Sequence, residues 1–172
     1  MTIGDIAHTT IEFVRDHEMW AVPIVFGLAF GESLAFISLI IPAWSALIGI
    51  GALIGMTGIE FAPIWIAAAL GAAFGDWVSY WFGLTFKEQV GRIWPLSRYP
   101  DLLPRGERFV QRWGVPGIFI GRFFGPLRAT VPLAAGIFIM PFWPFQLANF
   151  ISAFVWAAAL LAPGTFGMKY LM

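Results

Sequence analysis

Two long stretches of this chain contain no charged residue at all. The first runs from Ser33 to Ile59 and the second from Ala129 to Met168. Both exceed the roughly 20 apolar residues that a helix needs to cross a bilayer core of about 30 Å. A chain of 172 residues is too short to bury so much apolar surface in a soluble core, because a large fraction of its area stays exposed. The sequence therefore predicts an all-α integral membrane protein.

The cysteine and histidine content argues against several classes of function. There is no cysteine, so a disulfide framework, a thiolate nucleophile and a thiolate metal site are all excluded. Both histidines, His8 and His17, precede the first apolar run, and we expect neither a metal site nor another cofactor. The net charge of zero gives no indication of a nucleic-acid partner. No nucleophile–base pair stands out, so no enzymatic activity is expected.

The chain divides into a leader and one membrane domain. Residues 1–18 mix isoleucines with charged residues at loosely helical spacing, which predicts an amphipathic helix on the membrane surface. Residues 19–172 form the membrane domain, with a first repeat over 19–86, a polar loop over 87–113 and a second repeat over 114–168. Basic residues outnumber acidic ones in that loop, which places it in the cytoplasm. Its segment 104–113 has the pattern of a short amphipathic helix, with arginines on one side and aromatic residues on the other.

Proline and glycine interrupt the apolar run of the first repeat. We expect a spanning helix near 19–40, followed by a helix–turn–helix that enters the membrane and returns to the same side. Pro42 would begin this re-entrant hairpin, since proline suits the first position of a helix. The glycine-rich stretch 50–55 would form its turn, and a second spanning helix would cover 61–86.

The second repeat follows the same plan. A re-entrant piece is expected near 116–140 and a span near 142–166. Glu32 lies ten residues before Pro42, and Arg122 lies ten residues before Pro132. Paired broken segments in two similar halves are typical of a transporter core, with its site at the interface between the repeats. Because irregular backbone at membrane depth must be buried in protein or line a watery cavity, we also expect a cavity between the two pieces.

Four charged side chains fall inside the apolar segments, namely Glu32, Asp76, Arg122 and Arg128. At about 2.5–3.5 kcal/mol for each charge at the bilayer centre, four unpaired charges would cost on the order of 10–14 kcal/mol. Two acids and two bases can neutralise one another, so we expect pairing across the repeats. The pairs are either fixed clamps of the bundle or the lining of a hydrated site, where the arginines hold an anionic headgroup and an acid exchanges a proton.

Further features favour the second interpretation. Gly125-Pro126 breaks the helix between Arg122 and Arg128, so both guanidiniums can converge on one phosphate and fork onto its oxygens. Tyr80 shares a helical face with the buried aspartate, and Asn149 lies in the last span. Both are additional candidates for substrate binding.

At these residues the chain resembles a known family. The sequence GRFFGPLRATVPLAAGIFIM over 121–140 is similar to the arginine–proline–Ala-Gly signature of the DedA family, also called the VTT or SNARE-associated Golgi protein domain. GDWVSYWFG over 75–83 resembles the family's G-D-x-x-x-Y-x-x-G motif, and Glu32 matches its buried glutamate. The resemblance covers about residues 25–165. It makes four residues structural motif positions: Pro42, Pro126, Pro132 and Gly136.

The resemblance implies a bundle with two oppositely oriented re-entrant hairpins, each followed by a transmembrane helix, in the bacterial inner membrane. Family members move lipids between leaflets, and several depend on the proton gradient. Carried over, Glu32, Arg122 and Arg128 are the functional set, and Asp76 is a motif position. One departure is Trp44, where the family often has an acid. Without that acid, Glu32 is the first candidate for proton exchange, and Asp76 is the second.

The resulting hypothesis is a multi-pass flippase or scramblase for a phosphate-headgroup lipid, such as undecaprenyl phosphate or a phospholipid. Its partners would be anionic membrane lipids and protons, and association into a homo-oligomer is left open. One alternative is a small-solute or ion secondary transporter of the same architecture. The other is a membrane scaffold that transports nothing.

Overall fold

The computed structural model describes residues 18–34, 37, 44–87, 89, 96–98 and 100–171. All regular elements in these ranges are helical. They are α2 (Glu18–Ser33), α3 (Trp44–Thr57), α4 (Phe61–Phe86), the short 3-10 helix η2 (Leu96–Arg98), α5 (Leu102–Gly121), α6 (Gly125–Ile137) and α7 (Phe142–Leu171). The helix expected over 1–18, except for its last residue, and the helix start expected at Pro42 lie outside the described residues.

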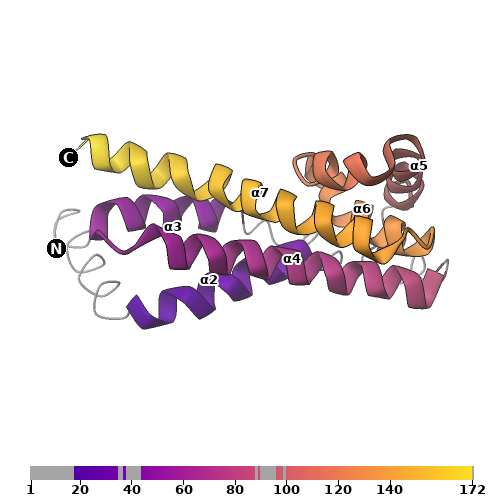
Figure 1. The fold of residues 1–172 in the computed structure, drawn as a ribbon, viewed down its shortest axis with the longest axis horizontal. Helices are drawn as coiled ribbons and strands as arrows, with labels where there is room; N and C mark the ends of the chain where they lie inside the picture. The colour runs from indigo at the N-terminus through magenta and orange to yellow at the C-terminus, as the bar shows by residue number, and fades with distance from the viewer. Residues whose placement is uncertain are drawn as a thin grey trace.

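Two long antiparallel helices, α4 and α7, run the length of the molecule (Figure 1). Phe61–Phe86 and Phe142–Gly167 are long and apolar enough to cross a membrane, which confirms the helices predicted over 61–86 and 142–166. Their antiparallel order follows from the contacts. Near one end the Trp65 indole donates a hydrogen bond of 2.9 Å to the Phe154 carbonyl. Towards the other end the Tyr80 ring stacks on Phe145.

The shorter helices cover this pair at its two ends (Figure 1). At one end α2 packs against α4 and α3 packs against α7. At the other end α6 packs against α4, and α5 packs against α6 and α7. Two apolar cores result. The larger one joins α2, α3, α4 and α7, whereas the smaller one joins α4, α5, α6 and α7.

The first repeat differs from the prediction in two respects. The spanning helix expected over 19–40 is wrong, since α2 ends at Ser33 and is 16 residues long, or about 24 Å at 1.5 Å per residue. Hydropathy alone could not reveal this end, because the residues on both sides of it are apolar. The helix stops where Glu32 and Ser33 meet the side chain of Arg128.

The turn expected over 50–55 is also wrong, because α3 continues without a break to Thr57. The glycines of this stretch serve close packing. A Cβ on Gly51 would lie 2.6 Å from the Leu161 carbonyl oxygen of α7, so only glycine allows this approach. The chain turns instead at Gly58, whose φ of +76° is easily adopted by glycine.

The second repeat agrees more closely with the prediction. Gly114, at a φ of +55°, divides α5 into an amphipathic segment before it and an apolar segment after it. A turn over 122–124 then separates α5 from α6. The expected break between the two arginines is therefore present. It falls just before Gly125-Pro126, which forms the first turn of α6, where proline is well tolerated.

Glycine contacts hold α4 against its neighbours. Gly71 and Gly75 lie against the backbone of Phe26 and Phe30 in α2. Because both residue numbers rise together, α2 and α4 run parallel. On the other side of α4, a Cβ added to Gly136 of α6 would lie 2.0 Å from the Tyr80 carbonyl oxygen. Such close approach of backbones replaces the hydrophobic drive that lipid does not provide.

Gly136→Ala is therefore expected to lower the free energy of unfolding by about 1–3 kcal/mol, the usual cost of overpacking. Unfolding of the purified protein in detergent measures it. The matched control is Gly49→Ala, because a Cβ there meets nothing within 4 Å, and a gain of up to about 1 kcal/mol in helix propensity is expected. Equal stability of the two variants would contradict the α4–α6 contact.

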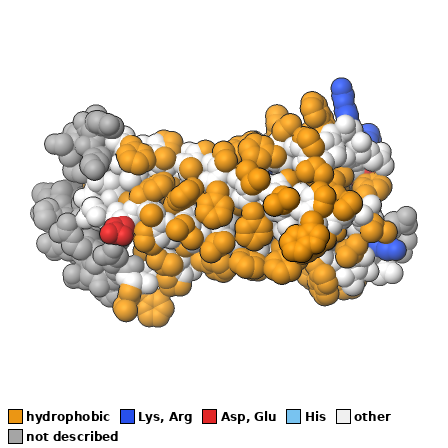
Figure 2. Space-filling model, viewed as in Figure 1, with side chains coloured by type: hydrophobic (Ala, Val, Ile, Leu, Met, Phe, Trp, Pro, Cys, Tyr) orange, Lys and Arg blue, Asp and Glu red, His pale blue; other side chains and the backbone are white. Residues whose placement is uncertain are grey.

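The surface has the distribution expected of a membrane protein. Hydrophobic side chains cover the middle of the face shown in Figure 2, and the charged side chains visible there lie towards the two ends. Large exposed apolar residues occur on α2, α4 and α7, among them Trp20, Trp81 and Leu147. Lipid tails are the natural partners of such a belt.

Candidate functional site

All four predicted intramembrane charges are buried and form two ion pairs. Glu32, Asp76, Arg122 and Arg128 are each at most 7% exposed. Arg122 pairs with Asp76, and Arg128 pairs with Glu32 at 2.7 Å. Arg128 also lies within electrostatic range of Asp76 and Arg122. The two pairs therefore make one neutral group, called here the charge cluster.

Arg122 follows the last residue of α5 and lies at the turn to α6. Its Nη2 donates to Asp76 Oδ2 of α4 and to Asn149 Oδ1 of α7 at 2.6 Å. Its Nε donates to the Ser152 hydroxyl at 3.0 Å. Asn149 is itself fixed, since its amide donates to the Ala73 carbonyl at 2.9 Å. One guanidinium thus ties α5 to both long helices.

Arg128 lies in the first turns of α6 and reaches across to the end of α2. Its Nη1 donates to Glu32 Oε1, and its Nη2 donates to the Ser33 hydroxyl at 3.1 Å. The guanidinium carbon lies 4.1 Å from the centroid of the Trp156 ring on α7, a geometry that favours a cation–π interaction. Arg128 therefore contacts one helix from each half of the chain.

The cluster lies where short helices end inside the bundle. Glu32 occupies the last turn of α2, and Arg122 follows α5 directly. Both residues therefore lie at or next to the end of a helix. Glu32 and Arg122 do not pair with each other. In this crossed pairing, Glu32 binds Arg128 and Arg122 binds Asp76.

Three buried polar atoms of the cluster lack a hydrogen-bond partner among the described residues. They are Asp76 Oδ1, Arg122 Nη1 and Arg128 Nε. A buried donor or acceptor without a partner costs about 1–3 kcal/mol, so such atoms are uncommon unless a ligand or water completes them. The two guanidiniums retain donors that an added anion could use.

The other two predicted polar residues have different surroundings. Asn149 belongs to the cluster through Arg122. Tyr80 is buried, but its hydroxyl donates to the Met140 carbonyl at 2.6 Å and its ring stacks on Phe145. Tyr80 therefore holds the junction of α6 and α7 against α4.

Sequence reasoning missed three contributors, Ser33, Ser152 and Trp156. Each contacts a guanidinium of the cluster. A signal existed for two of them: Ser33 follows Glu32 directly, and Ser152 lies three residues after Asn149, on the same helical face. Trp156 carried no signal, because tryptophan is common in apolar helices of this chain.

Among the structural motif positions, the structure places Pro132 and Gly136 in α6, where both are buried. In the part of the chain that is described, no group of three metal-ligating acidic, histidine or cysteine residues comes together. The charge cluster itself offers electrostatic chemistry. Two cations and two anions can exchange partners, and a carboxylate that takes up a proton would release its arginine.

The chain is similar in sequence to several known membrane proteins. The family model of the VTT domain matches residues 41–166. The inner membrane protein YabI of Escherichia coli is 34% identical over 152 residues, which are 88% of this chain and 60% of that protein. An uncharacterized membrane protein of Buchnera aphidicola is 30% identical over 88% of this chain and 59% of its own length.

A third relative, an uncharacterized membrane protein of Mycobacterium tuberculosis, is 32% identical over 81% of this chain and 68% of its own length. The chain spans about three fifths of the length of the first two relatives. No solved structure matches it.

Proposed function

The chain belongs to the VTT domain family of membrane proteins, also called the DedA family, and we propose that it moves a lipid with an anionic phosphate headgroup between the two leaflets of the bilayer. The observation that carries this proposal is the pair of buried guanidiniums. Arg122 Nη1 and Arg128 Nε keep N–H groups without an acceptor among the described residues. A phosphate has enough oxygens to satisfy both.

The helix arrangement supports passage through the bundle. We infer that α2 and α3 enter the membrane from one side and turn back near its middle, since they have only 16 and 14 residues. The end of α5 and α6 would do the same from the other side. Helix ends at membrane depth require shielding by protein or water. The charge cluster lies at these ends, where a headgroup crossing the bilayer would need polar contacts.

In the proposed cycle, the lipid phosphate competes with the carboxylates for the arginines. Proton uptake by Glu32 would remove its charge and release Arg128 to the phosphate, and proton loss would restore the ion pair and expel the lipid. Because Trp44 stands where the family often has an acid, Glu32 is the first candidate for this step and Asp76 is the second. A bacterial inner membrane, as named for the relative from Escherichia coli, is the proposed location.

Leaflet exchange in liposomes tests the proposal. Wild-type protein is expected to accelerate exchange of labelled phosphatidylglycerol at least tenfold over protein-free liposomes, and to leave a labelled neutral glycolipid much slower. Chemical bleaching of the outer leaflet measures the exchange, with and without an imposed pH gradient. Folded wild-type protein that exchanges no lipid under either condition would refute the proposal.

A non-transporting scaffold is the second candidate, and one observation favours it. Each guanidinium already has a carboxylate partner, as a fixed clamp would have. A buried ion pair contributes little to stability by itself, however, because desolvation offsets the attraction.

A transporter of small solutes is another alternative. It would show thermal stabilisation by a soluble substrate and none by lipid phosphates.

A further inference from the structure

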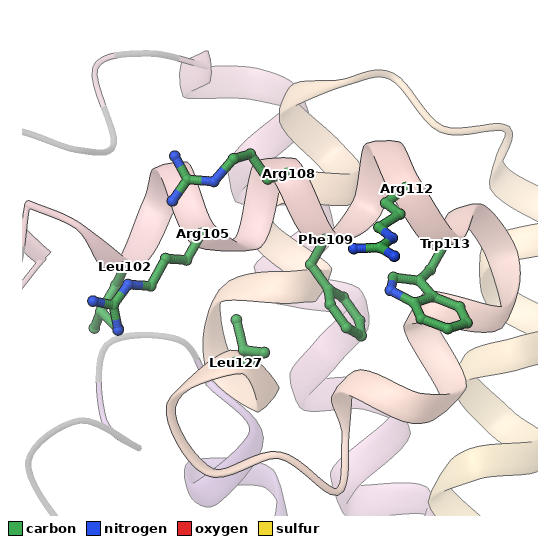
Figure 3. A pocket seen from close by; sticks show the side chains of 7 residues that line it. All are labelled: Leu102, Arg105, Arg108, Phe109, Arg112, Trp113 and Leu127. Carbon is green, nitrogen blue, oxygen red and sulfur yellow. The ribbon is translucent and has the colours of Figure 1, made fainter.

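The amphipathic segment of α5 carries a second group of arginines, outside the charge cluster. Arg105, Arg108 and Arg112 line a hollow of about 520 Å³ together with Phe109 and Trp113, and with Leu102 and Leu127. In Figure 3 the Phe109 and Leu127 side chains lie between those of Arg105 and Arg112, and the Arg108 side chain extends along the upper edge of the helix. The arginines and aromatics, expected on opposite sides of this helix, therefore line the same hollow.

The helical spacing explains this arrangement. Residues 105, 108 and 112 lie at i, i+3 and i+7, on one face of a helix. Phe109 and Trp113 follow Arg105 at i+4 and i+8, on an adjoining face. The Arg112 guanidinium lies 5.9 Å from the Trp113 ring centroid, which holds charged and aromatic groups together.

None of these three arginines forms an ion pair with another described residue. All three are exposed. Three neighbouring positive charges repel one another, so an anion between them would be stabilised. Phosphate is a suitable anion, because guanidinium groups can fork onto its oxygens.

The apolar part of the hollow selects an amphiphile. Phe109, Leu127 and Trp113 offer hydrophobic contact beside the charges, and Trp113 is 46% exposed, as tryptophan at a membrane interface often is. The Lys and Arg side chains at the right-hand end of Figure 2, where Figure 1 places α5, lie beside the hydrophobic belt. A volume of about 520 Å³ falls within the usual range for ligand sites. It accommodates a headgroup and the first part of an acyl chain.

We propose that this hollow is a binding site for an anionic membrane phospholipid, with its phosphate on Arg105, Arg108 and Arg112 and its acyl chain against Phe109 and Leu127. The site is distinct from the charge cluster and does not depend on transport. Its floor is nevertheless close to the cluster, because Leu127 directly precedes Arg128 on α6. The bound lipid contacts both the surface helix and the helix that carries the buried arginine.

Lipid binding to the purified protein in detergent tests the site. Wild type is expected to prefer phosphatidylglycerol over phosphatidylcholine, and Arg105→Gln/Arg112→Gln should lose about 25-fold of that preference, at about fivefold for each arginine near an anionic lipid. Titration followed by native mass spectrometry measures it. The matched control Lys87→Gln/Arg98→Gln removes two exposed positive charges outside the hollow and should change the preference less than threefold.

Quenching by lipids brominated on the acyl chain locates the bound chain. The fluorescence lost on replacing Trp113 by phenylalanine isolates the Trp113 signal, which should be quenched by brominated phosphatidylglycerol more than by brominated phosphatidylcholine. Equal losses of preference in the two double variants, or equal quenching by the two lipids, would overturn the site. Displacement of the lipid by millimolar inorganic phosphate would also overturn it, since the acyl chain would then contribute nothing.

Discussion

Replacing Arg122 by glutamine is expected to lower the free energy of unfolding by about 3–5 kcal/mol, the cost of breaking a buried ion pair from one side. The substitution leaves the Asp76 carboxyl group buried without its ion-pair partner. It also removes the bonds that join α5 to Asn149 and Ser152. Denaturant unfolding in detergent measures the loss.

A double variant shows whether the loss of stability comes from the unpaired Asp76. Asp76→Asn added to Arg122→Gln should recover more than half of the loss, because no buried charge then remains at that pair. Arg98→Gln is the control, since Arg98 is exposed and a surface arginine contributes at most about 1 kcal/mol. A double variant as unstable as the single one would show that Arg122 does not stabilise the protein through its pairing with Asp76.

Replacing Arg128 by lysine is expected to slow leaflet exchange of an anionic lipid by about ten- to a hundredfold while changing stability little. Lysine keeps a charge for Glu32 but cannot also donate in the planar fork that a phosphate requires. A lost hydrogen bond to a charged group is worth about 1.5–3 kcal/mol, which corresponds to that range of rates. Exchange in liposomes and unfolding in detergent are measured on the same preparation.

This substitution also separates transporter from scaffold. A fixed clamp would use the contacts of Arg128 with Ser33 and Trp156 for stability only, so the scaffold interpretation expects a loss of stability and no change in exchange. Arg98→Lys is the conservative control outside the bundle and should alter neither quantity. Normal exchange by a well-folded Arg128→Lys protein would remove Arg128 from the transport mechanism.

The sequence predicted the spans more successfully than the helix ends. The helices over 61–86 and 142–166 are marked by continuous apolar residues and by the turn signals around them, which are local properties. Whether a glycine turns the chain or lies against another helix is not local. Gly51 faces the backbone of Leu161, more than a hundred residues later, and no feature near Gly51 distinguishes it from a turn glycine.

The charged residues of the candidate site were determined by the sequence itself. A charge inside an apolar run is costly, so Glu32, Asp76, Arg122 and Arg128 had to be buried together and neutralise one another. Which acid meets which base was decided only by the tertiary structure. The crossed pairing of Glu32 with Arg128 and Asp76 with Arg122 depends on how α2, α4 and α6 pack. That packing is set by contacts between backbones, which the order of the residues does not express.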